Sequence, residues 1–95
     1  MESTETEPYF VFMNHDPEYE RLRADRTNRG VQELDLYLSR KHDELLANTL
    51  EAGSYKKTLS FVIVDGFSVD ITEAQANVLR SAKEVRIVEK NQELA

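Results

Sequence analysis

Two His-Asp pairs are the residues of this chain most suited to acid–base or metal chemistry. His15 precedes Asp16, and His42 precedes Asp43. Neighbouring residues on a helix point in different directions, so His42 and Asp43 are not expected to form a catalytic dyad. Two distant histidines in a chain without cysteine do not make a metal site. His42 is therefore predicted to be a solvated or core-edge side chain.

The remaining polar candidates carry no catalytic signature. The serines lack the strand–turn–helix setting that exposes a nucleophile. We therefore predict no catalytic residue, no metal and no cofactor, and a protein that is not an enzyme. One further role for His42 is a pH sensor, whose protonation in an acidic compartment would loosen the domain and release a partner.

The charge of the chain limits its partners. Twelve Lys and Arg against 18 Asp and Glu give a net charge of −6, which disfavours nucleic acid and anionic membranes. No stretch approaches the roughly 18 apolar residues of a membrane span. The polar start of the chain has no signal-peptide core. The protein is expected to be cytoplasmic if free-standing, and secretory or extracellular if excised from a longer precursor.

The elements that position these residues follow the order β-α-β-β-α-β. Strands are predicted at 8–13, 55–64, 67–71 and 85–89, and helices at 31–52 and after the capping box of Thr72 and Gln75. Asp65 and Gly66 indicate a hairpin turn, and Gly53 a helix C-cap. This order predicts a ferredoxin-like α+β sandwich, a four-stranded antiparallel sheet with two helices on one face. Residues 1–7 are predicted to be a disordered tail, 8–91 one domain, 18–30 a charged loop or a frayed helical turn, and 92–95 a C-terminal tail.

The first two strands are apolar on both of their faces. Phe10 and Phe12 alternate with three apolar residues of their own strand, and Phe61 and Ile63 lie in a strand with the same character. Two helices cannot cover both faces of one sheet, so apolar surface is expected to stay open. These four residues are the candidates for a contact with a protein partner. A strand-end contact, a dimer contact or a misplaced strand boundary are the alternatives, and the free protein is predicted to be monomeric.

From Tyr55 onward the order of motifs resembles the propeptide, or inhibitor I9, family of subtilisin-like serine proteases, in particular the plant propeptides. The motifs are Tyr55-Lys56-Lys57, Leu59-Ser60-Phe61, Gly66-Phe67-Ser68-Val69, Ile71-Thr72-Glu73-Ala74-Gln75-Ala76 with Leu79, and Val85 with Val88-Glu89. Upstream, residues 9–13 resemble the opening strand of the family and residues 40–46 its first helix. Residues 18–30 lie outside the resemblance.

The resemblance implies a protease inhibitor, and also a folding chaperone, whose partner is a subtilisin-like serine protease. The open sheet face would pack on two surface helices of the enzyme. Glu89 and Asn91 would cap the N-termini of these helices. The tail would lie in the substrate cleft as an added strand, contributing Gln92, Glu93, Leu94 and Ala95.

Some features depart from the family or leave other functions open. Asp65 replaces the usual Asn, Glu84 a common Gly, and the tail ends short of the usual cleavage point. A non-inhibitory regulatory module of the same fold is the alternative function. Acylphosphatases share the strand order, but the turn after the first strand is acidic here. RNA binding is disfavoured by charge and by the missing aromatic signature.

Overall fold

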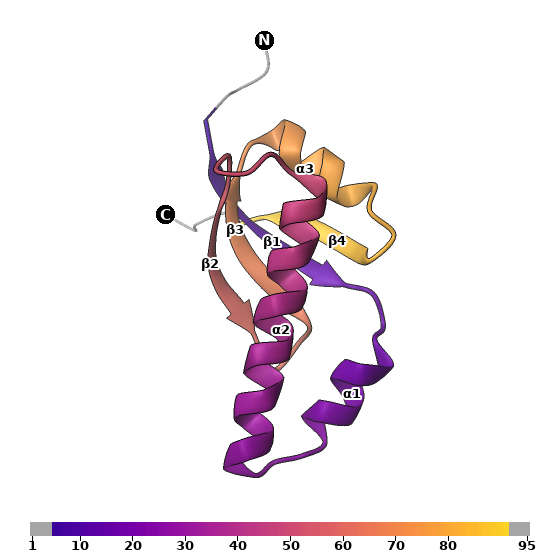
Figure 1. The fold of residues 1–95 in the computed structure, drawn as a ribbon. Helices are drawn as coiled ribbons and strands as arrows, with labels where there is room; N and C mark the ends of the chain where they lie inside the picture. Colours follow the sequence, from indigo (N-terminus) through magenta and orange to yellow (C-terminus); the bar gives the residue numbers. More distant parts are fainter. Residues whose placement is uncertain (1–4, 92–95) are drawn as a thin grey trace.

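The computed structural model describes residues 5–91, which form one antiparallel sheet with three helices (Figure 1). In chain order the elements are β1 (Glu7–Met13), α1 (Pro17–Arg23), α2 (Asn28–Thr49), β2 (Lys56–Phe61), β3 (Gly66–Ile71), α3 (Glu73–Arg80) and β4 (Val85–Lys90). The strand order is β2-β3-β1-β4, with every pair antiparallel. This arrangement confirms the ferredoxin-like fold predicted from the sequence. Within residues 5–91, no helix combines the length and apolar character that a membrane crossing needs.

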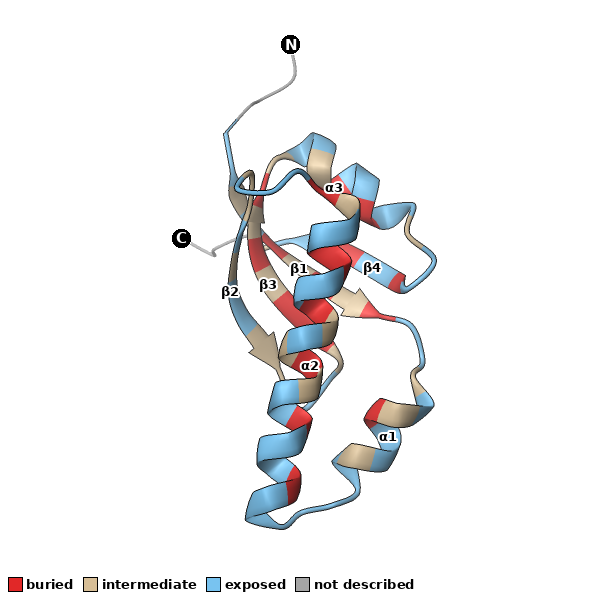
Figure 2. Ribbon diagram, in the orientation of Figure 1, coloured by how far each residue is buried: buried red, intermediate tan, exposed pale blue. Residues whose placement is uncertain are grey.

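The core lies between the sheet and the two helices α2 and α3 (Figure 2). Strand alternation points every second residue of β1 and β3 toward the helices. The buried side chains of these strands are Tyr9, Val11, Met13, Phe67, Val69 and Ile71. From the helices, Leu45, Leu46 and Leu79 pack against them. The predicted capping box is present at the start of α3, where Gln75 N donates to Thr72 Oγ and Thr72 N donates to Gln75 Oε1.

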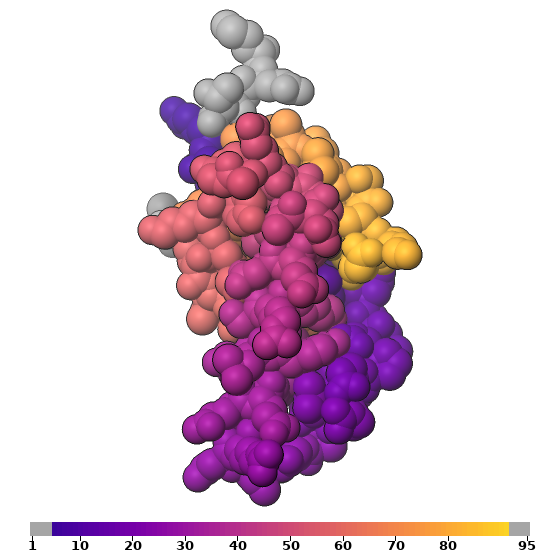
Figure 3. Space-filling model, viewed as in Figure 1, coloured from indigo at the N-terminus to yellow at the C-terminus, as the bar shows by residue number. Residues whose placement is uncertain are grey.

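Residues 18–30 were predicted to be a loop or a frayed helical turn, and the loop was wrong, because the segment contains most of α1 and the first turn of α2. Asp16 caps α1 by accepting a hydrogen bond from Glu18 N at 3.0 Å, and Pro17 occupies the first helical turn. Tyr19 packs with Leu34 and Leu38 in a second, smaller core. The space-filling view shows α1 lying against the N-terminal half of α2 (Figure 3). A few well-placed apolar side chains are therefore enough to fix a short, highly charged helix.

The end of α2 also differs from the prediction. The helix ends at Thr49, and Leu50 is its extended C-cap. Gly53 has a φ of +78°, but it lies in the turn that follows the helix and is not its C-cap. The left-handed conformation that favours glycine is thus used to reverse the chain toward β2.

The second strand is shorter than predicted. It ends at Phe61, and residues 62–65 form the turn to β3, so Ile63 is a turn residue and Gly66 already belongs to β3. The Tyr19 hydroxyl lies 2.9 Å from both Val62 O and Ile63 O. Because these carbonyls bond to a side chain of α1, they do not extend the strand ladder.

Gly66 is required by close packing and not by a special backbone angle. A Cβ at this position would lie 2.7 Å from Val11 O, 3.0 Å from Phe12 Cδ1 and 3.3 Å from a carbon of Phe61. We expect Gly66→Ala to lower the free energy of unfolding by about 1–3 kcal/mol, because the backbone of β1 must move. Chemical denaturation measures this loss. A variant as stable as the wild type would show that the two strands can separate at no cost.

Candidate functional site

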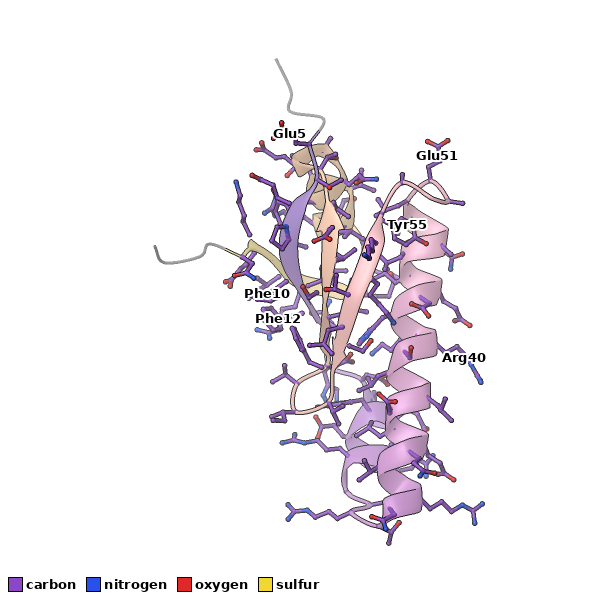
Figure 4. All side chains as sticks on the ribbon, turned by 90° about the vertical axis from the view of Figure 1, so that its left-hand side faces the viewer. Glu5, Phe10, Phe12, Arg40, Glu51 and Tyr55 are labelled. Atoms are coloured by element: carbon purple, nitrogen blue, oxygen red, sulfur yellow. The ribbon has the colours of Figure 1, made fainter. Side chains whose placement is uncertain are left out.

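Three aromatic rings gather on the sheet face that no helix within residues 5–91 covers (Figure 4). Phe10 and Phe61 have centroids 5.8 Å apart, Phe12 and Phe61 6.4 Å, and Phe10 and Phe12 6.5 Å. We call these three residues the aromatic cluster. Figure 4 shows Phe10 and Phe12 pointing away from α2. Each ring is only partly buried. The apolar open face expected from β1 is therefore present.

A β-bulge in β2 determines which of its side chains face the helices and which face the open side of the sheet. The register shifts between Lys57 and Leu59, so Lys57 pairs with buried Val69 while Leu59 pairs with Ser68 on the open face. Leu59 is 57% exposed and joins the apolar surface. Ile87 of β4, which pairs with Phe12, adds a further side chain that sequence reasoning did not select. Neighbouring side chains of a strand point to opposite faces, so the core position of Val88 could have placed Ile87 on the open face.

The predicted capping residues lie at one edge of this face. Glu89 pairs with Phe10 across β1 and β4 and is exposed. Asn91 donates its backbone N–H to Pro8 O at 2.9 Å, so the β1–β4 pairing continues one residue past β4. The structure therefore places Glu89 beside Phe10 of the aromatic cluster and Asn91 beside Pro8, two residues before Phe10 in β1. Residues 92–95, with the predicted cleft residues Gln92, Glu93, Leu94 and Ala95, lie outside the described part of the chain. Ile63 lies on the adjoining turn and is 82% exposed.

His42 was predicted to be solvated or at the core edge, and this was wrong because its side chain is fully buried. Its Nδ1 lies 2.9 Å from Ser60 Oγ, and its Nε2 lies 2.8 Å from Asp65 Oδ1. The ring also packs on Phe67 with centroids 4.8 Å apart. The missed signal is the helical spacing, because His42 follows the buried Leu38 by four residues.

Asp65 connects this histidine to a second charged group. Lys41 Nζ donates to Asp65 Oδ2 and, at 2.8 Å, to Asp16 Oδ2. Tyr37 OH donates to the same Asp16 oxygen at 2.6 Å. At the other end, Lys57 Nζ lies 3.2 Å from Ser60 Oγ and 2.8 Å from Asp43 Oδ1. We call this chain of contacts the polar network; its members are Asp16, Tyr37, Lys41, His42, Asp43, Lys57, Ser60 and Asp65.

Hydrogen bonds within the polar network stabilise the charged forms of Asp16 and Lys41. Burial raises the pKa of Asp16, but hydrogen bonds from Lys41 and Tyr37 outweigh it and lower the pKa to about 2. Burial lowers the pKa of Lys41, and its hydrogen bonds to Asp16 and Asp65 reverse this and raise it. Burial, followed by the bond to Asp16, raises the pKa of Tyr37. Among residues 5–91, every buried side-chain nitrogen or oxygen has a hydrogen-bond partner.

Ser60, His42 and Asp65 have the composition of a serine-protease triad but not its accessibility. The imidazole is fully buried, and the Ser60 hydroxyl also lies within reach of Lys57. A catalytic nucleophile needs a free hydroxyl that a substrate can approach. Asp43 contacts Lys57, while His42 contacts Ser60 and Asp65. The two neighbours therefore do not form a dyad, as predicted. The arrangement therefore fixes the β2–β3 turn to α2. Within the described residues, no cluster of three metal-ligating side chains occurs.

The charge on Asp16 makes stability depend on pH. The pKa in the folded protein is about 2, below the ordinary 3.8, so this stabilisation is present above pH 3.8 and is lost as the pH falls through 2. The difference between these two pKa values corresponds to roughly 2 kcal/mol of folding free energy. Asp16→Asn keeps an oxygen that can cap α1. We expect it to be less stable than wild type by roughly 2 kcal/mol at pH 7 and equal near pH 2. Urea denaturation at several pH values measures this, and a loss that does not change with pH would contradict it.

Comparison with known proteins relates the chain to plant proteases. It is 43% identical to subtilisin-like protease SBT2.5 of Arabidopsis thaliana over 70 residues, which are 73% of this chain and 9% of that protein. Subtilisin-like protease SBT2.6 of the same plant is 36% identical over the same shares. Subtilisin-like protease SBT2.4 is 43% identical over 53% of this chain and 6% of its own length.

The remaining comparisons found no counterpart. No family model matches the chain, and no solved structure matches it. The chain spans about 9% of the length of the first two relatives. Over most of its length, it is therefore similar to one short stretch of plant subtilisin-like proteases.

Proposed function

We propose that this chain is a propeptide-like inhibitor of a subtilisin-like serine protease and also a folding chaperone for that enzyme. The observation that carries the proposal is the aromatic cluster on the uncovered sheet face. A face of this kind loses apolar contact with water when a partner covers it. The similarity to a short stretch of plant subtilisin-like proteases supplies the class of partner.

In this proposal the aromatic cluster docks on helices at the surface of the enzyme. Glu89 is exposed beside Phe10, where a carboxylate can accept hydrogen bonds from the free N–H groups of a helix N-terminus. Asn91 continues the same edge and can cap a second helix. Residues 92–95 follow Asn91 in the sequence and would occupy the substrate cleft as an added strand.

His42 stays a candidate pH sensor in this proposal. Its ring is enclosed by Ser60 of β2, Asp65 of the turn and Phe67 of β3, while Lys41 and Lys57 contact its two polar partners. A proton added to the ring would change the charge of the polar network beneath the turn. Inhibition by His42→Gln that has the wild-type pH dependence would remove this role.

Titration of a plant subtilisin-like protease with the purified chain tests the proposal. We expect peptide hydrolysis to slow in the micromolar range, and deletion of residues 92–95 to remove inhibition while binding persists. Glu89→Ala with Asn91→Ala is expected to weaken binding by about 1–2 kcal/mol because two helix caps are lost. The matched control is Glu44→Ala with Asn48→Ala on the exposed side of α2, where no change is expected.

Three outcomes would decide between the alternatives. Failure of the chain to bind any such protease would contradict the proposal. Binding without inhibition would favour the non-inhibitory regulatory module. Full inhibition by the chain that lacks residues 92–95 would show that the tail is not the inhibitory element.

A further inference from the structure

The turn between β2 and β3 exposes three consecutive branched apolar side chains. Val62, Ile63 and Val64 are 36%, 82% and 47% exposed. We call these three residues the hairpin tip. A solvent-facing turn normally carries polar residues, and a run of exposed apolar side chains is unfavourable unless it serves a contact. The hairpin tip is therefore a second surface that the fold does not explain.

The backbone of the hairpin tip is held from several sides. The Tyr19 hydroxyl lies 2.9 Å from the carbonyls of Val62 and Ile63, and Met13 N donates to Asp65 O at 2.9 Å. The side chain of Asp65 accepts hydrogen bonds from Lys41 and His42. A contact surface that is fixed before binding loses little conformational entropy on binding. The tip thus has the properties of a preorganised anchor.

The hairpin tip is continuous with the aromatic cluster. One hollow is lined by Phe12, Leu59, Phe61 and the three tip residues. Residues 59–64 contain no charged side chain. A partner that covers the aromatic cluster can therefore cover the tip without desolvating a charge of this chain.

Arginines and carboxylates both border the other side of the tip. A second hollow is lined by Ile63 and Val64 together with Arg23 and Arg86 and the carboxylates of Asp16, Glu20 and Asp65. Within residues 5–91, Arg86 makes no ion pair, whereas Arg23 lies 3.8 Å from Glu20. The carboxylates of this hollow already pair with Arg23 or Lys41. Arg86 is therefore the guanidinium that suits a partner whose own apolar patch is bordered by a carboxylate.

We propose that the hairpin tip is a second contact with the protease, reached by the same docking that covers the aromatic cluster. It would receive an apolar patch of the catalytic domain, with a carboxylate of that domain placed near Arg86. This inference rests on the proposed function, because it takes the protease as the partner. It adds an anchor at the turn, whereas β4 ends at the opposite end of the sheet, where Lys90 pairs with Tyr9.

The test compares affinities for a catalytically inactive protease by calorimetry. We expect Ile63→Ser with Val64→Ser to raise Kd about tenfold, and Arg86→Ala to raise it about threefold with a weaker dependence on salt. The matched control is Val31→Ser with Leu36→Ser, which removes two exposed apolar side chains of α2 and should leave Kd unchanged. Thermal unfolding verifies that each variant is folded.

The outcomes separate this inference from the proposed function. If the tip variant binds like wild type while Phe10→Ala with Phe61→Ala weakens binding, the tip contact is wrong and the docking face stands. If the wild-type chain binds no protease, both fail. If the wild type sediments as a dimer and the tip variant as a monomer, a second copy of the chain occupies the tip and the proposal is overturned.

Discussion

Asp65→Ala is expected to lower the free energy of unfolding by about 3–5 kcal/mol at pH 7. The side chain of Asp65 is only 8% exposed and accepts hydrogen bonds from both Lys41 and His42. Its loss leaves the Lys41 ammonium with Asp16 alone and leaves Nε2 of a fully buried imidazole without a partner. Breaking a buried pair from one side costs far more than the pair contributes as a whole.

A loss of this size is a large part of the total stability of a small domain, which is about 5–15 kcal/mol. Guanidinium denaturation followed by circular dichroism measures it. Asp43→Ala is the matched control, because Asp43 also pairs with a lysine but its side chain is 60% exposed. We expect that control to lose less than about 1 kcal/mol. Equal losses in the two variants would show that the polar network does not hold the turn.

The sequence predicted the fold well because its strongest patterns are local. The alternation in β3 and the capping box of α3 each depend on residues a few positions apart. The helix α1 was left undecided between a loop and a frayed helical turn, because its apolar residues, Tyr19 and Leu22, are stabilised by α2 and not by a periodic face of their own. Tertiary packing decided this segment, which local propensity leaves undetermined.

The open face was predicted more accurately for β1 than for β2. An unbroken alternation placed Phe10 and Phe12 together, and the structure keeps both on the uncovered side. In β2, the bulge at residue 58 shifts the alternation by one position. This shift sends Lys57 and Ser60 toward the helix side. A bulge leaves no reliable mark in one sequence, so the end of β2 and the position of Ile63 could not be derived.

The role of His42 depends on contacts between distant residues. Helical spacing from Leu38 to His42 could have indicated burial. The partner of its Nε2, Asp65, lies 23 residues further along the chain, in the turn after β2. That contact exists only once β2 and β3 have packed on α2. The sequence therefore predicted the correct helix and strands, but it could not predict which of their polar side chains form hydrogen bonds with one another.

Phe10→Ala with Phe61→Ala is expected to raise the Kd for the protease about a hundredfold. These rings lie on the central strand β1 and the edge strand β2, with centroids 5.8 Å apart. Aromatic side chains at the centre of an interface are typical hot spots, which contribute about 2–4 kcal/mol each to affinity, though not additively. Calorimetry with an inactive protease measures the effect.

Stability and affinity must be separated in this experiment. Both rings are only partly buried on a face that no helix covers, so their removal is expected to lower the free energy of unfolding by less than an equivalent core substitution. Phe67→Leu provides the matched comparison, because Phe67 is fully buried on the helix side of β3. We expect it to lower stability and leave Kd unchanged while the domain is folded. An unchanged Kd for the variant Phe10→Ala with Phe61→Ala would mean that the protease binds another surface of the chain.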